Sequence, residues 1–253
     1  MRIGISVAQC DRLARPAAVS AAARAAEQLG YSSVWVCDSL LDPAGVLAAT
    51  AAMTDRVRLG ASLHLTAGAD PASIARSLAT VDLMSDGRLS VALAMAPGAP
   101  EHCLDEVLDA LDALDARGDG GGRPTVLLDG REPAALDRVA RRADGWAPAG
   151  LPVARLAPLW AGLRDLAAGQ GRDPDRLQLV VPVGIVLTEE AVDGPRASYQ
   201  GDLDQVAEDV DLIRRVGAHE VVLSLDGDPT LDQALDGYAR IAEAAELRGA
   251  RIG

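Results

Sequence analysis

Several runs of residues that include polar side chains, each at the end of a short apolar segment or directly after it, could take part in acid–base or binding chemistry. They are Asp38-Ser39, Ser62-Leu63-His64, the stretch from Met95 to Glu101, and Asp129-Gly130-Arg131. A histidine can give or accept a proton near neutral pH, which makes His64 a candidate acid or base. The carboxylates Asp38 and Glu101 occupy comparable positions, after the second and fourth apolar segments.

The elements that must position these residues alternate along the chain. Short, β-branched apolar segments predict strands at 3–7, 33–37, 57–65, 88–95, 124–128, 145–147, 178–187 and 220–225. Amphipathic segments predict helices at 17–29, 43–53, 71–84, 101–116, 133–142, 153–168, 203–216 and 231–248. This α/β pattern predicts one (β/α)8 barrel, a TIM barrel, that spans residues 1–253 as a single domain. A doubly wound open sheet is the alternative, because periodicity does not show closure.

In such a barrel the functional groups gather at the carboxyl ends of the strands. Each candidate also has a purely structural interpretation. Asp38 could cap a turn, His64 could be a satisfied core or surface histidine, and Glu101 could complement a helix dipole by about 0.3–1 kcal/mol. Met95 could be core, and we expect Trp146 to be a packing anchor and His219 to be structural.

Composition excludes several classes of function. The 253 residues carry a net charge of −13, which disfavours nucleic-acid and membrane-surface binding. All 24 basic residues are arginine, so Schiff-base and P-loop lysines are excluded. The 3 cysteines show no metal-ligand or disulfide spacing, and the apolar runs are too short for a signal peptide or a membrane span. We therefore expect a cytoplasmic protein with no metal site and a small-molecule substrate.

Long stretches of the chain resemble the luciferase-like monooxygenase superfamily, most closely the branch that uses the deazaflavin coenzyme F420. They are AAARAAEQLGYSSVWVCDSLLDP, DRVRLGASLHLT, DPASIARSLATVDLMSDGRLSVALA, RVARRADGWAP and DLDQVAEDVDLIRRVGAHEVVLSL. The resemblance implies a (β/α)8 barrel, commonly a homodimer, with F420 (alternatively FMN) across its mouth.

By that resemblance, Asp38 would face the cofactor head group, Ser39 stands where many members have histidine, and Glu101 matches an acidic position of some deazaflavin enzymes. The pair Ser62-Leu63 matches a place where similar proteins have a non-prolyl cis peptide, a bond that costs about 3–4 kcal/mol. Cofactor contacts are expected from the following residues: Ser39, Ser62, Leu63, Met95, Gly98, Asp129, Gly130 and Arg131.

The chain departs from the family at two turns and one insertion. Residues 94–100, Ala-Met-Ala-Pro-Gly-Ala-Pro, replace a glycine-rich turn, and Asp129 and Glu132 flank the expected phosphate site beside Arg131. The insertion after the fourth strand is shortened to DARGDGGGRPT. Two alternatives therefore stay open. One is a barrel without a cofactor that serves as a binding protein or as the partner of an intact homologue, and the other is non-redox acid–base chemistry through His64.

Overall fold

The computed structural model describes residues 1–7, 16–37, 42–116, 123–227 and 229–247. Its strands are β1 (Arg2–Ser6), β2 (Ser33–Cys37), β3 (Arg58–Leu65), β4 (Leu89–Met95), β5 (Thr125–Leu128), β6 (Gly145–Trp146), β7 (Gln178–Leu187), β8 (Gln200–Gly201) and β9 (Glu220–Leu225). Its helices are α1 (Pro16–Gln28), α2 (Pro43–Ala51), α3 (Pro71–Met84), α4 (His102–Asp115), α5 (Pro133–Arg142), α6 (Val153–Gly169), α7 (Leu203–Arg215) and α8 (Leu231–Leu247).

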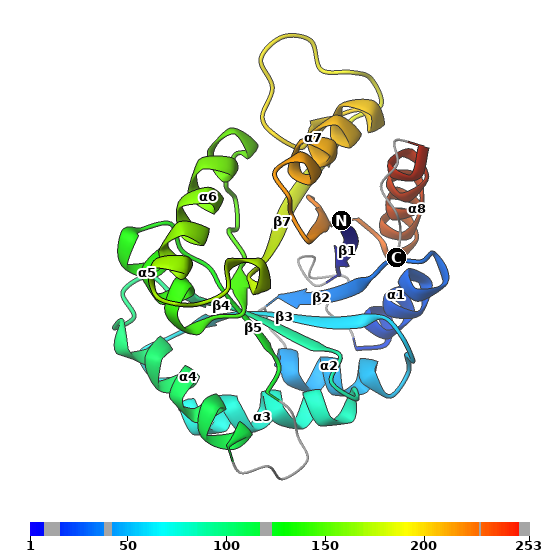
Figure 1. The fold of residues 1–253 in the computed structure, drawn as a ribbon. Coiled ribbons are helices and arrows are strands. Elements are labelled where there is room, and N and C mark those ends of the chain that lie inside the picture. The colour runs from blue at the N-terminus through cyan, green and yellow to red at the C-terminus, as the bar shows by residue number, and fades with distance from the viewer. Residues whose placement is uncertain (8–15, 38–41, 117–122, 228, 248–253) are drawn as a thin grey trace.

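Eight parallel strands close into a ring that the helices surround (Figure 1). The order is β6-β5-β4-β3-β2-β1-β9-β7, and the pairs Gly145↔Gln178 and Trp146↔Leu179 join β6 back to β7. The predicted barrel is thus confirmed, and the open sheet is wrong. The two-residue strand β8, which pairs with the end of β7, was not predicted because it is too short to show a period.

Capping residues explain why several helices begin where they do. Asp42 accepts hydrogen bonds from the backbone N–H groups of Ala44 and Gly45, both at 3.3 Å, and Pro43 takes the first helical position of α2. The α7 helix begins with a capping box, in which Asp202 and Gln205 satisfy each other's backbone N–H groups. At α2 and α7 these sequence signals therefore fix the residue at which the helix begins.

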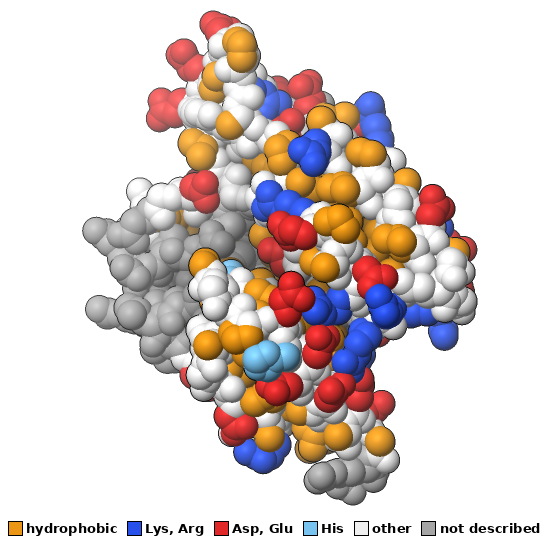
Figure 2. Space-filling view, turned by 90° about the vertical axis from the view of Figure 1, so that its left-hand side faces the viewer, with side chains coloured by type: hydrophobic (Ala, Val, Ile, Leu, Met, Phe, Trp, Pro, Cys, Tyr) orange, Lys and Arg blue, Asp and Glu red, His pale blue; other side chains and the backbone are white. Residues whose placement is uncertain are grey.

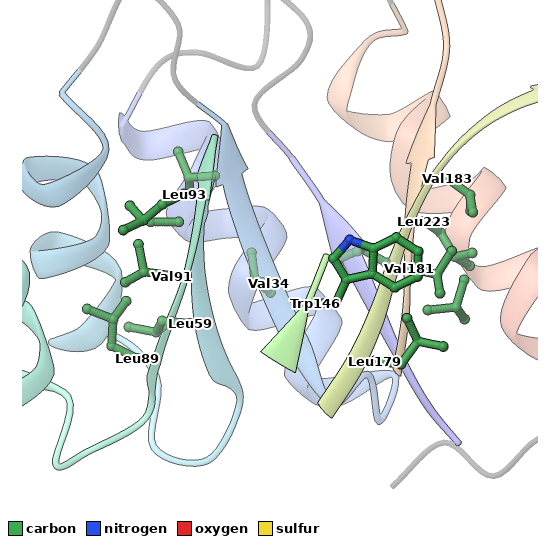
Figure 3. Close-up of a cluster of buried hydrophobic side chains, with 14 of the residues drawn as sticks. Val34, Leu59, Leu89, Val91, Leu93, Trp146, Leu179, Val181, Val183 and Leu223 are labelled. Carbon is green, nitrogen blue, oxygen red and sulfur yellow. The ribbon is translucent and has the colours of Figure 1, made fainter. Parts of the chain in front are cut away.

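Side chains alternate along each strand between the helix layer and the barrel interior. The outward side chains form the main hydrophobic core, and Figure 3 shows part of it on β3, β4, β7 and β9. The inward side chains form a separate, smaller cluster within the ring, composed of Trp35, Ala92, Leu127, Ala147, Val180 and Val222. The larger share of apolar burial thus joins helices to strands and leaves the axis of the barrel for other side chains.

The lower end of the barrel interior is closed by charged groups. Glu220 has a fully buried side chain, forms an ion pair with Arg58, and lies 3.6 Å from Nε of Arg2. Ser33 donates its hydroxyl to Glu220 and accepts a hydrogen bond from Nε1 of Trp35 at 3.0 Å. This network lies below the indole and completes a floor across the axis.

The outer face over α4 and α5 carries interleaved arginine and acidic side chains (Figure 2). Arg138 contacts Asp105 at 2.9 Å, and Arg142 contacts Asp109 and Asp112, each at 2.8 Å. Ion pairs near the surface are worth about 0–1 kcal/mol each, so these contacts add little to the stability of the fold. No described helix combines the length and the apolar character needed to cross a bilayer.

The packed floor predicts that alanine substitutions at two glycines have opposite effects on stability. A Cβ on Gly60 would lie 2.0 Å from the indole of Trp35, whereas a Cβ on Gly162, in α6, would meet nothing within 4 Å. Gly60→Ala should therefore lower the free energy of unfolding by about 1–3 kcal/mol through overpacking. Gly162→Ala should raise it by about 0.5–1 kcal/mol through helix propensity. Urea unfolding of both variants checks this, and equal effects would contradict the packed floor.

Candidate functional site

A cavity of about 530 Å³ lies at the carboxyl ends of the strands, above the indole of Trp35. Its lining, in which small and polar residues predominate, comes from six of the strands and from the loops after β5 and β6. The lining residues are Ser6, Trp35, Cys37, Ser62, His64, Ala92, Ala94, Asp129, Ala147, Ala149, Gly150, Val180, Pro182, Val183, Gly184, Val222 and Ser224. Its size falls within the range of roughly 300–1,000 Å³ that is usual for small-molecule sites.

The cavity exists because the inward positions above Trp35 carry small side chains. TIM-barrel interiors are usually filled by layers of bulky branched residues. Here the upper positions hold hydroxyls, methyl groups and glycine, for example Ser6, Ala94, Gly184 and Ser224. The upper end of the barrel interior is therefore a chamber with a polar rim and mostly apolar walls.

The structure brings together three of the residues predicted for the site. Ser62 and His64 are two apart on β3, so both face the interior, and Asp129 follows β5. His64 pairs in register with Ala94 on β4, and the backbone N–H of Asp129 donates to the carbonyl of Leu93 at 2.9 Å. His64 and Asp129 therefore stand at one level of the barrel, separated by the methyl group of Ala94.

Other predicted residues lie away from this chamber. Leu63 and Met95 alternate to the opposite face and pack against the core beneath the helices. Gly98 is exposed with a φ of 79°, and Glu101 has an 81% exposed side chain that lies 3.8 Å from the guanidinium of Arg138. Asp38 and Ser39 lie outside the described residues.

Gly130 and Arg131 lie at the rim next to Asp129. The carbonyl of Gly130 accepts a hydrogen bond from Nε1 of the buried Trp146 at 2.8 Å, and Arg131 donates from Nη2 to the carbonyl of Ala149 at 2.6 Å. The guanidinium thus stands beside the chamber without lining it. Trp146, fully buried, anchors this turn to the core, as its packing interpretation predicted.

The expectation of a cis peptide between Ser62 and Leu63 is wrong. All peptide bonds of the described residues are trans. The strand β3 pairs continuously through this point, with Ser62 opposite Cys37 on β2 and Ala92 on β4. A trans bond keeps that double ladder intact, whereas the cis geometry would interrupt the alternation of side chains.

The sequence analysis missed the groups that line the far wall of the chamber. Ser6 on β1, Cys37 on β2 and Ser224 on β9 all face inward, and Ser6 Oγ lies 3.5 Å from Cys37 Sγ. The alternation of polar and apolar residues within each strand carried this information, since each of these residues is in phase with the inward positions of its strand.

Asp129 is the carboxylate that the described residues bring to the chamber. Burial raises its pKa, although the backbone N–H groups of Gly130 and Ala149, which donate to Oδ1 at 2.7 and 3.3 Å, act in the opposite direction. The positive charge of Arg131 and the imidazole of His64 also favour its ionised form, more weakly. An ionisable group with a perturbed pKa in a cavity is a typical feature of a functional site.

His219, by contrast, is structural, as predicted. Its Nδ1 accepts a hydrogen bond from the backbone N–H of Leu179 at 3.0 Å, and its ring packs edge-on against Trp160. Burial lowers its pKa, and the positive charge of Arg2 acts in the same direction. It therefore holds β7 against β9 at the end opposite the chamber.

Because the pKa of Asp129 is raised, we expect that removing its charge increases the stability of the protein, by an amount that depends on pH. The pKa of Asp129 is higher in the folded protein than its value of about 3.9 in the unfolded chain. The contribution of this carboxyl to the free energy of unfolding is therefore fully present below the unfolded pKa, and it is lost as pH rises through the folded pKa. Asp129→Asn should remove that decline, so its gain in unfolding free energy is largest near pH 7 and vanishes near pH 3.

Glu27 provides the control of opposite sign. Burial opposes its ionisation, but N–H groups of Val57, Arg56 and Asp55 donate to its carboxylate and lower its pKa. Its contribution is present above about pH 4.3 and lost as pH falls through the folded value. Glu27→Gln should therefore destabilise at pH 7 and not at acid pH. Denaturation of both variants from pH 3 to 7 checks the signs, and a loss for Asp129→Asn at pH 7 would contradict this account.

Comparison with known proteins agrees with this architecture. Residues 1–118 match the family model described as luciferase-like monooxygenase. An uncharacterised protein of Mycobacterium tuberculosis and one of Mycobacterium bovis are each 30% identical over 53% of this chain. The chain spans 58% of the length of these curated relatives.

Solved structures share the fold over nearly the whole chain. The monooxygenase RslO1 of Streptomyces bottropensis has a TM-score of 0.76 at 19% identity and covers 99% of this chain and 100% of its own. The coenzyme F420-dependent tetrahydromethanopterin reductase of Methanopyrus kandleri has a TM-score of 0.75 at 14% identity, with 97% of each chain covered. EDTA monooxygenase of Chelativorans sp. BNC1 has a TM-score of 0.79 at 11% identity and covers 100% and 95%. Residues 1–118 are thus similar in sequence to the luciferase-like monooxygenases, and the solved structures share the barrel fold over nearly the whole chain.

Proposed function

We propose that this protein is an oxidoreductase that binds F420, or alternatively FMN, at the barrel mouth and transfers hydride between it and a small organic substrate. The observation that carries the proposal is the chamber at the carboxyl ends of the strands, in a chain whose first 118 residues match the luciferase-like monooxygenases. Similar structures that are described as F420-dependent support a deazaflavin, and a riboflavin lyase described with modified FMN supports FMN as the alternative.

The chamber fits the ring of such a cofactor better than its phosphate. Methyl groups of Ala92, Ala94 and Ala147 offer apolar walls to a flat ring, and the volume of about 530 Å³ admits one. The phosphate-bearing tail would lie outside, where Arg131 is the cation beside the rim and Glu132 and Asp129 repel an anion. When bound, the cofactor would supply the hydride chemistry.

Within this proposal the protein's own groups position the ligand and move a proton. The inward hydroxyl of Ser62 would hydrogen bond the ligand, and the indole of Trp35 would close the chamber below it. His64 would give a proton to the substrate heteroatom, or take one from it, as the hydride moves to or from the adjacent carbon. Exclusion of bulk water by the closed floor would strengthen these interactions.

Titration with a cofactor tests the proposal. Absorbance and tryptophan fluorescence should show saturation with F420, and with weaker affinity for FMN, because Trp35 lines the chamber. Ala94→Leu, which narrows the chamber, should weaken binding at least about tenfold, a loss of 1.4 kcal/mol. The matched change Ala154→Leu, on the exposed face of α6, should leave binding unchanged.

Absence of saturation with either cofactor would overturn the proposal and favour a barrel without a cofactor. The acidic residues on both sides of Arg131 are the observation behind that second candidate, since they weaken any phosphate site at this turn.

His64→Gln should leave the cofactor titration unchanged and slow the proton-coupled step, by roughly 10²–10⁴-fold for a general acid or base.

A further inference from the structure

We infer that the chamber binds an uncharged or cationic ligand through an N–H group that donates to Asp129, and that it rejects anions. The inference deepens the proposed function, on which it rests for the use of the chamber, because it names the substrate class. The substrate would be a small nitrogen-containing molecule, such as an amine, imine, amide or amidine.

The first support is the way in which Asp129 is held. Its backbone N–H donates to the carbonyl of Leu93, and its Oδ1 accepts from the N–H groups of Gly130 and Ala149. Both of those bonds end on one oxygen, and among the described residues Oδ2 accepts no hydrogen bond. A fixed carboxylate on a cavity wall with an unused acceptor oxygen is suited to recognise a donor on a ligand.

The second support is the balance of charge. Arg131, which follows Asp129 by two residues, directs its Nη2 to the carbonyl of Ala149 and not to the carboxylate. No arginine lines the described walls, and the chain has no lysine. Burial raises the pKa of Asp129, so its ionised form is poorly solvated and gains from a donor that a ligand supplies.

The third support is the shape and polarity of the remaining wall. The described lining presents methyl groups at Ala92, Ala94 and Ala147, which suit the flat apolar body of a small ligand. The imidazole of His64 stands at the level of Asp129 on the other side of Ala94. A ligand nitrogen bound to the Asp129 carboxylate would therefore lie at the same level of the chamber as His64, the proposed proton donor.

The same carboxylate explains why anions are rejected. A ligand carboxylate or phosphate in the chamber would meet Asp129 at short range in surroundings of low dielectric, where like charges repel most strongly. The anionic tail of a cofactor would stay at the rim beside Arg131, and the ring and the nitrogen-containing substrate would share the interior.

Three probes of nearly equal shape test the inference without any cofactor. Benzamidine is cationic, benzamide is neutral with N–H donors, and benzoate is anionic. Calorimetry and tryptophan fluorescence of the full chain at pH 8 should rank their affinities in that order. Asp129→Asn should weaken benzamidine by roughly tenfold to hundredfold, the loss of one charge-assisted hydrogen bond, and should bring it level with benzamide.

Two further variants keep the test falsifiable. Asp109→Asn removes a carboxylate that is 69% exposed on α4 and should leave all three affinities unchanged. Ala94→Leu should weaken benzamidine and benzamide alike, because it narrows the chamber without altering its charge. Unfolding curves establish that each variant is folded.

Benzoate binding as tight as benzamidine, or benzamidine affinity that Asp129→Asn leaves unchanged, would overturn the inference. These outcomes are separate from the test of the proposed function. Benzamidine binding that depends on Asp129 in a protein that binds neither F420 nor FMN would support the inference and overturn the redox role. Saturable cofactor binding without the predicted order of probes would do the reverse.

Discussion

The structure depends on what fills the axis of a closed ring of eight strands. Closure forces every second side chain inward, so each strand contributes to one shared interior. At the lower end that interior is occupied by Trp35 and by Glu220 with its arginine partner Arg58. Removing one partner of such a buried pair typically costs about 3–5 kcal/mol, so the floor is a fixed boundary.

Above that floor the inward residues are too small to fill the ring, and the site follows from this difference. The core between strands and helices is built mainly from large aliphatic side chains, whereas about half of the residues that line the chamber are serine, alanine or glycine. Most apolar burial therefore lies in the outer layer, and the described residues leave a cavity in the upper interior. The carboxylate of Asp129 lies on the wall of this interior, where burial solvates its charge poorly and raises its pKa.

The sequence predicted the architecture because local and global signals agree. Apolar runs ended at residues such as Cys37 and Leu128, and Asp-Pro pairs such as Asp42-Pro43 marked helix starts, so the alternation of elements was legible. Closure was inferred from the count of strands and from the family resemblance, since the β6–β7 pairing joins residues far apart in sequence and leaves no local trace.

The site was predicted less completely, because the sequence analysis did not ask which residues of each strand face the interior of the barrel. His64 was found because it lies near the carboxyl end of a strand, Asp129 because it follows one, and Ser62 through the family resemblance. Leu63 and Met95 were nominated without regard to the face on which they fall. Ser6 and Ser224 were missed because they lie within strands, where a hydroxyl resembles a tolerated core residue. The trans bond at Ser62 differs from the geometry implied by the family resemblance, since β3 pairs on both sides there.

The most direct test of the central claim is a crystal structure of the protein grown with F420. The account predicts that the deazaflavin ring lies inside the chamber, against Ala94 and above Trp35, and that the phosphate is outside near Arg131. A ring bound elsewhere, or side chains that close the space between Trp35 and the rim, would contradict it.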